Sequence, residues 1–263
     1  MAPVDVALRT VAAVLTVGAV AVVAANPQFR ADLAADARNP VASDALQREA
    51  NGKTKGYAFL LKSDDSRYPG RWCGGTIRYT VDLTRADAVG MDRASEPARW
   101  DRGLRNWARA SNDYYRFDYA GERQLTTKDD GQLDLDSIEP GTIGITYVTG
   151  SEDVGDSRYG AAAVRGRTAG NGGLQVTSDA GVDGGSLVGD RGFVMIDAED
   201  ALALSADGMR EALYQHESGH ALGLGHVNAS SSIMNGTLSD SRVTLEPGDI
   251  AGLRALTQMP CSD

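Results

Sequence analysis

Histidine and cysteine are scarce in this chain of 263 residues, which contains three histidines and two cysteines. Two thiols are too few for a cysteine-rich metal site, and three histidines allow at most one centre of three imidazoles. Basic residues are also in deficit, since 26 lysines and arginines face 36 acidic residues and the formal charge is −10. This charge repels a phosphate backbone, so we expect no nucleic-acid partner.

One uncharged apolar stretch, residues 10–25, follows Arg9 near the amino terminus. Its length fits the apolar region of a secretory signal and falls short of the roughly 20 residues of a transmembrane helix. Adding residues 6–8 brings it close to that length if Arg9 reaches the membrane surface. We therefore predict a signal peptide or signal anchor over residues 1–25. The protein is then secreted, or held on the outer face of the cell membrane through residues 6–25.

The rest of the chain divides into two parts. Residues 26–68 are rich in Ala, Asp, Arg, Asn and Ser with little apolar periodicity, which predicts a stalk or a short pro-segment. Residues 69–263 have the length of one domain. Cys73 and Cys261 lie near the two ends of this domain. In an exported protein a disulfide between them is the default expectation, and two unpaired buried thiols are the alternative.

Apolar patterns predict the elements of this domain. Strands are expected over residues 74–83, 115–119, 142–148 and 193–197. Trp100, Leu104 and Trp107 recur at helical spacing after Ser95, a suitable N-cap, which predicts a helix with a core-facing stripe. Two more helices are expected, from about residue 207 and over residues 246–256. The stretch between residues 149 and 192 is rich in Gly, Asp and Ser, and loops this long usually line a site, bind ions or are partly disordered.

All three histidines lie in one motif, HESGHALGLGH, at residues 216–226. On a helix, His216 and His220 project from one face and can meet one metal ion. Gly223 permits a left-handed turn that brings His226 back as a third ligand. Glu217 can reach a water molecule at the metal without being a ligand. Three imidazoles and an open position predict a catalytic site with one Zn²⁺ per chain, and solvent-facing histidines on a surface helix are the alternative.

This motif, followed by Ile233 and Met234, resembles the metzincin zinc peptidases, in which a methionine-containing turn lies beneath the metal. The short spacing to Met234 and the segments IRYTV, IDAED and LEPGDIAGLRAL are similar to the matrixin branch over roughly residues 71–256. The resemblance implies an α+β fold with αβα-like layers and a twisted, mostly parallel sheet with one antiparallel edge strand. A catalytic helix, a Met-turn supported by Met234 and a C-terminal helix complete it. The implied activity is that of a zinc metalloendopeptidase of EC 3.4.24 type, with Glu217 as general base.

The resemblance also implies how a protein or peptide substrate is bound. The substrate lies extended along an edge strand, for which residues 160–164 are our candidate, with an ordinary interior strand as the alternative. Leu213 and Tyr214 are candidates for a pocket beside the catalytic helix, and equally for plain core. A calcium ion is a second candidate cofactor, with a solvated acidic turn as the alternative; its ligands would be Asp197, Glu199 and Asp200.

Several positions depart from the family pattern. No histidine remains for the structural zinc of animal matrixins, so the resemblance is to a bacterial type. Gly236 stands where astacin-like and serralysin-like members carry a tyrosine, and Asn235-Gly236 replace the usual proline after the Met-turn. Cys73 lies in the first strand region, not in a pro-segment, so no cysteine switch is expected; a Cys73 thiolate on zinc is the alternative to the disulfide.

The rival functions are a zinc hydrolase of small amides or esters and a catalytically silent cell-surface binding module. The oligomeric state is left open.

Overall fold

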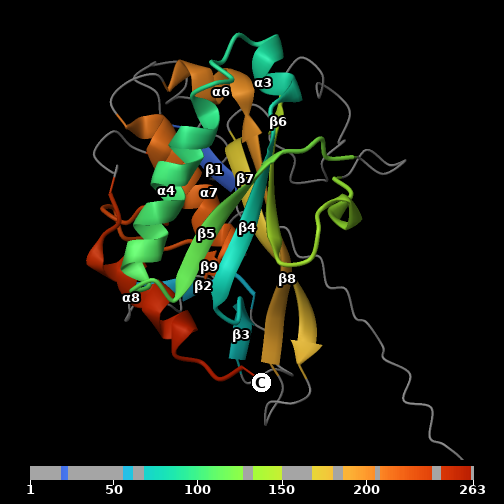
Figure 1. The fold of residues 1–263 in the computed structure, drawn as a ribbon. Coiled ribbons are helices and arrows are strands. Elements are labelled where there is room, and N and C mark those ends of the chain that lie inside the picture. Colours follow the sequence, from blue (N-terminus) through green and yellow to red (C-terminus); the bar gives the residue numbers. More distant parts are fainter. Residues whose placement is uncertain are drawn as a thin grey trace, which may run out of the picture.

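The computed structural model describes residues 19–22, 56–61, 68–126, 133–149, 168–179, 186–204, 208–238 and 244–261. One mixed sheet runs in the order β10-β1-β7-β8-β6-β4-β5, and β3 joins it by pairing with β8 (Figure 1). Its strands are β1 (Ala19–Val22), β3 (Tyr68–Arg71), β4 (Gly75–Asp82), β5 (Tyr115–Glu122), β6 (Thr142–Val148), β7 (Thr168–Asp179), β8 (Ser186–Asp197) and β10 (Thr237–Leu238). A separate antiparallel pair consists of β2 (Ala58–Phe59) and β9 (Leu224–Gly225).

The strand directions confirm the α+β fold class. Strands β5, β4, β6 and β8 are mutually parallel, and β7 is antiparallel to β8. On the far side of β7, β1 pairs antiparallel to it, with Val20 opposite Gly170. The other edge of β1 pairs parallel to β10, with Ala21 opposite Thr237. A strand of four residues therefore lies between β7 and β10.

Strand β6 is buried along its whole length, as the continuous apolar run TIGITYV predicts for a central strand. Its residues Ile143 and Ile145 belong to the main core, which helices α4 (Glu96–Ala110) and α7 (Met209–Ala221) cover (Figure 1). A smaller cluster lies at the other face of the sheet, near the 3₁₀ helix η2 (Leu135–Ser137). It consists of Leu125, Leu133, Leu135, Ile138, Val148, Phe193 and Met195.

Helix α4 presents its predicted apolar stripe to α7 and the sheet. Trp100 and Trp107 are fully buried, and their indole N–H groups donate to the Tyr147 hydroxyl and the Gln215 carbonyl at 2.9 Å each. Ser95 occupies the N-cap position, but its backbone is helical and its hydroxyl donates to the Asp92 carbonyl. The predicted capping bond is therefore absent, because an accepting cap requires extended backbone.

The stretch between residues 149 and 192 is predicted to be a long loop, but β7 and the first part of β8 lie in it as an antiparallel pair. Pairing between these two strands, and not the apolar pattern of their sequence, explains the difference.

Further elements differ from the expectations in length. Strands β5 and β8 are longer than predicted. Asp82 in β4 is buried, and its carboxylate is satisfied there because it accepts the Leu125 N–H at 2.9 Å. The remaining helices are α3 (Thr84–Ala88), α6 (Ala198–Ala203) and α8 (Pro247–Thr257). Across the described residues, no helix has the length and apolar character needed to cross a membrane.

Three predictions concern residues that are wholly or largely outside the described ones. Residues 160–164, the candidate edge strand, are not among them. The predicted leader is described only at β1, and the predicted stalk only at residues 56–61 and the first residue of β3. The boundaries of these two segments therefore stay predictions.

Candidate active site

The three histidines converge on one point. His216 and His220 lie one turn apart on α7 and are fully buried. Helix α7 ends at Ala221, and Gly223, two residues beyond, has a φ of +103°, the left-handed conformation expected of it. The chain then turns through β9 to His226. The three Nε2 atoms are 2.9 Å apart for His216 and His220, 3.0 Å for His220 and His226, and 3.1 Å for His216 and His226.

Hydrogen bonds at the far side of two rings fix their tautomers. The Nδ1 atom of His216 lies 2.6 Å from the Ile233 carbonyl, and that of His220 lies 2.8 Å from the Leu224 carbonyl. A carbonyl oxygen only accepts, so each Nδ1 must carry the proton and donate it. Each Nε2 is then left with a lone pair directed at the other histidines.

This arrangement fits a tetrahedral metal ion. Neighbouring lone pairs about 3 Å apart repel each other unless a cation lies between them, and ligands of a zinc ion are roughly 3.3 Å apart when each bond is about 2.0–2.1 Å. Burial lowers the pKa of His220 to about 4, and burial followed by the effect of His220 lowers that of His226 well below the ordinary value. Both rings are therefore neutral at pH 7, as metal ligation requires. Within the described part of the chain, this is the one group of at least three His, Cys, Asp or Glu side chains with ligand atoms close enough for a metal.

Glu217 is fully buried between α7 and β7. No described group makes a hydrogen bond of normal geometry to either carboxylate oxygen, although the Gly172 N–H is near enough to lower the pKa somewhat. Burial is the larger effect and raises the pKa of Glu217 well above its ordinary value. A carboxylate with open acceptor positions, one residue from a metal ligand, is a group that can take up a proton.

The Met-turn is held beneath the histidines by a buried carboxylate. Met234 is buried, and its sulfur packs against Gly219 of α7, where a Cβ would lie 2.4 Å from it. Asp249, at the start of α8, accepts the Ile233 N–H at 3.0 Å, the Met234 N–H at 3.3 Å and the Ser232 hydroxyl. It also accepts the N–H of Glu246, which closes the capping box of α8. The Ile233 carbonyl accepts from His216, so Asp249 supports this candidate metal ligand through the Met-turn.

A second buried carboxylate lies behind the catalytic helix. Glu96, fully buried at the start of α4, accepts the hydroxyl of Tyr147 at 2.7 Å and that of Tyr214, and pairs with Arg210 at 3.2 Å. Burial raises the pKa of both tyrosines well above the ordinary value, so their hydroxyls stay protonated and donate. Tyr214 also stacks on Trp100, with ring centroids 4.0 Å apart. Tyr214, a candidate for the pocket, is thus part of the core, and Leu213 is fully buried as well.

The acidic residues at the end of β8 have a structural use. Asp197 is the N-cap of α6, and its Oδ1 accepts the N–H groups of Glu199 at 2.9 Å and Asp200 at 3.0 Å. Burial raises the pKa of Asp197, and burial followed by repulsion from Asp197 and Glu199 raises that of Asp200 to about 6. Helix capping accounts for one carboxylate, and a calcium ion here stays a prediction.

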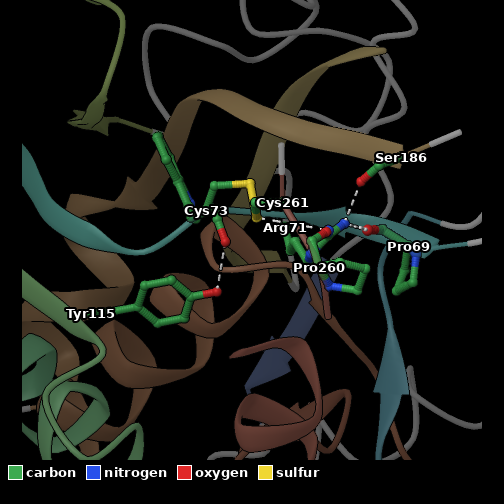
Figure 2. Close-up of a disulfide and its surroundings, with 8 residues drawn as sticks. Pro69, Arg71, Cys73, Tyr115, Ser186, Pro260 and Cys261 are labelled. Atoms are coloured by element: carbon green, nitrogen blue, oxygen red, sulfur yellow. Dashed lines mark hydrogen bonds between the residues drawn. A yellow bond between two sulfur atoms is a disulfide. The ribbon is translucent and has the colours of Figure 1, made fainter. Parts of the chain in front are cut away.

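The predicted disulfide is present and joins Cys73 to Cys261 (Figure 2). Beside it, the buried guanidinium of Arg71 donates to the Ser186 hydroxyl at 2.6 Å and to the Pro260 carbonyl. The Tyr115 hydroxyl donates to the Trp72 carbonyl at 3.0 Å. The tail behind α8 is therefore joined by a covalent bond to the segment between β3 and β4, and by a hydrogen bond to Arg71 of β3, which in turn bonds Ser186 of β8. Because Cys73 is oxidised here, its thiolate is not available to the metal.

Two residues of the site were not predicted from the sequence. A signal for Asp249 existed, because Glu246 and Asp249 have the spacing of a capping box ahead of an apolar helix. Nothing comparable marked Glu96, since an acidic residue in the first turn of a helix is usually solvated.

Comparison with known proteins agrees with this geometry. A search of curated proteins gives no significant match. The family model described as Matrixin, Peptidase_M10, matches residues 72–258. This family consists of zinc-dependent peptidases of the metzincin type, and the three histidines of the site are consistent with its zinc. Because the match covers well over half of the 263 residues, the chain belongs to the matrixin family.

Proposed function

We propose that this matrixin is an endopeptidase that holds one zinc ion on His216, His220 and His226 and uses Glu217 as general base. The observation that carries the proposal is the convergence of three histidine Nε2 atoms within 3.1 Å of one another, two of them left unprotonated by the hydrogen bonds at Nδ1. Glu217 lies next to them with both oxygens open to accept a proton. Zinc supplies Lewis acidity that acidifies a water molecule and polarises the scissile carbonyl. Glu217 takes the proton from the attacking water and returns it to the leaving amine.

The substrate backbone adds to the sheet along β7. In support, β7 already pairs on that edge with β1, and β1 pairs on its other side with β10. In this structure β1 takes the place between β7 and β10 as an extended strand paired on both sides, and a substrate backbone would take the same place, which suits a peptide better than a small amide or ester. The disulfide supports export to an oxidising compartment, because such bonds rarely persist in the cytosol.

Replacing Glu217 with glutamine tests the proposal. The amide is nearly isosteric but cannot take the proton, so we expect the peptidase rate to fall by about 10² to 10⁴ while zinc content is unchanged. The matched control is Glu211→Gln on the same helix, which removes ion pairs with Arg99 and Arg102 at the surface and should leave the rate nearly unchanged. Rates are compared per zinc ion, measured by elemental analysis.

Two outcomes would contradict the proposal. One is a Glu217→Gln variant with the rate of the wild type. The other is zinc-loaded wild-type protein that cuts no peptide in a broad library, which would favour the small-substrate or binding-module function instead.

A further inference from the structure

Strand β7 crosses the catalytic helix at Glu217, and two of its glycines face that residue. Gly170 and Gly172 are two positions apart, so both lie on one face of the strand. Neither is among the residues with positive φ, so the backbone at both positions suits any amino acid. A side chain is excluded because neighbouring atoms fill the space beside each glycine, and not because of the backbone conformation.

At Gly170 the excluded side chain would collide with the carboxylate of Glu217. A Cβ built there lies 2.6 Å from Oε1, 2.7 Å from Cγ and 2.8 Å from Cδ of Glu217. The carboxylate therefore occupies the volume that even an alanine would need. The Glu217 side chain could rotate away, but the carboxylate would then leave its present place.

At Gly172 the collision is with the main chain of the helix. A Cβ there would lie 2.2 Å from the Glu217 carbonyl oxygen and 2.9 Å from its carbonyl carbon. No rotamer change can relieve a contact between a Cβ and backbone atoms, because neither side can rotate away. The strand would have to move from the helix by about 1 Å to restore an ordinary contact, and a misplacement of that size can cost on the order of 10² in rate.

We propose that Gly170 and Gly172 are positioning residues of the peptidase. Gly170 leaves room for the carboxylate of the general base. Gly172 sets the spacing between the catalytic helix and the strand that binds the substrate. This inference rests on the proposed function, because it assigns both glycines a role in the same site.

Alanine substitutions separate the two roles. Gly170→Ala is expected to lower kcat by about 10² while KM changes by less than about threefold, because the base moves and the groove does not. Gly172→Ala is expected to raise KM as well as lower kcat, since β7, the strand that binds the substrate, itself moves. Zinc content should stay at one ion per chain in both, because the atoms nearest to each added Cβ belong to Glu217 and not to a histidine.

Gly173→Ala is the matched control. It adds the same methyl group to the same strand but on the opposite face, where the Cβ would lie 2.5 Å from the ring of Phe193. It should lower the melting temperature yet keep kcat per zinc-loaded molecule within about threefold of wild type. A loss of kcat equal to that of Gly170→Ala would mean a merely structural effect and would overturn the inference.

A stability cycle provides a readout that does not depend on turnover. Gly170→Ala should lower the melting temperature in the wild-type background but have little effect in a Glu217→Ala background, where the carboxylate that the methyl group meets is gone. Equal losses in both backgrounds would overturn the role of Gly170. If zinc-loaded wild-type protein cuts no peptide, the proposed function fails, while this cycle still decides whether Gly170 makes room for Glu217.

Discussion

Replacing Asp249 with alanine is expected to loosen the Met-turn and, through it, the zinc site. The change leaves the Ile233 and Glu246 N–H groups without the acceptor they have now, whereas the Met234 N–H keeps the Ser232 hydroxyl at 3.0 Å. Each orphaned N–H costs about 1–2 kcal/mol, and the loss at Glu246 already includes the lost half of the capping box of α8. We therefore expect the free energy of unfolding to fall by about 2–4 kcal/mol.

The metal site should weaken as well. The Ile233 carbonyl that accepts from His216 belongs to the turn that Asp249 holds, and loss of such outer support typically lowers metal affinity about 10- to 100-fold. Urea unfolding of the metal-free protein measures stability, and competition with a zinc chelator measures affinity. Asp101→Asn, which removes a surface ion pair with Arg105, is the control and should cost less than about 0.5 kcal/mol. An Asp249→Ala variant within about 1 kcal/mol of wild type, with unchanged zinc affinity, would refute the reasoning.

Three further predictions concern the metal, the disulfide and the acidic strand end. Removing zinc with a chelator should abolish peptidase activity and lower the melting temperature. The loss of stability is about 4 kcal/mol relative to protein in zinc at a thousandfold excess over its Kd. Equal melting temperatures with and without zinc would contradict a bound ion. Replacing Cys73 and Cys261 by serine should reduce the free energy of unfolding by up to about 5 kcal/mol, because the bond closes a loop spanning 188 positions; urea unfolding measures it, and unchanged stability would refute it. The folded pKa of Asp200 is raised to about 6, so ionisation of this carboxyl destabilises the fold as pH rises from about 4 to 6. In calcium-free buffer, the free energy of unfolding of Asp200→Asn should therefore equal that of wild type below pH 4. At pH 7.5 it should exceed that of wild type by about 1 kcal/mol, after allowance for solvent screening. Melting curves across this range check the sign, and calcium should reverse the order at pH 7.5 if it binds there.

The sequence predicted well the parts of the fold whose causes are local. The spacing of His216 and His220 sets a helix face, Gly223 marks the turn that follows it, and the apolar run at residues 142–148 indicates a strand. The stripe of Trp100 and Trp107 likewise identified the packed face of α4.

The remaining parts depend on contacts between distant segments. Residues 168–173 carry little apolar signal, so their membership of β7 follows from pairing with β8 and not from their own pattern. The close approach of Gly170 to Glu217 is equally invisible, because it joins two elements far apart in the chain. Glu96 is buried only because two tyrosine hydroxyls and Arg210 surround it once the chain has folded.

The bond between Cys73 and Cys261 has a consequence for a protein that is itself a peptidase. The three histidines and Glu217 lie within the stretch of chain that this bond closes. Self-cleavage in a surface loop of that stretch gives two fragments that remain covalently joined. A nicked molecule can therefore keep its site assembled and migrate as one species on a gel until a reducing agent separates the pieces.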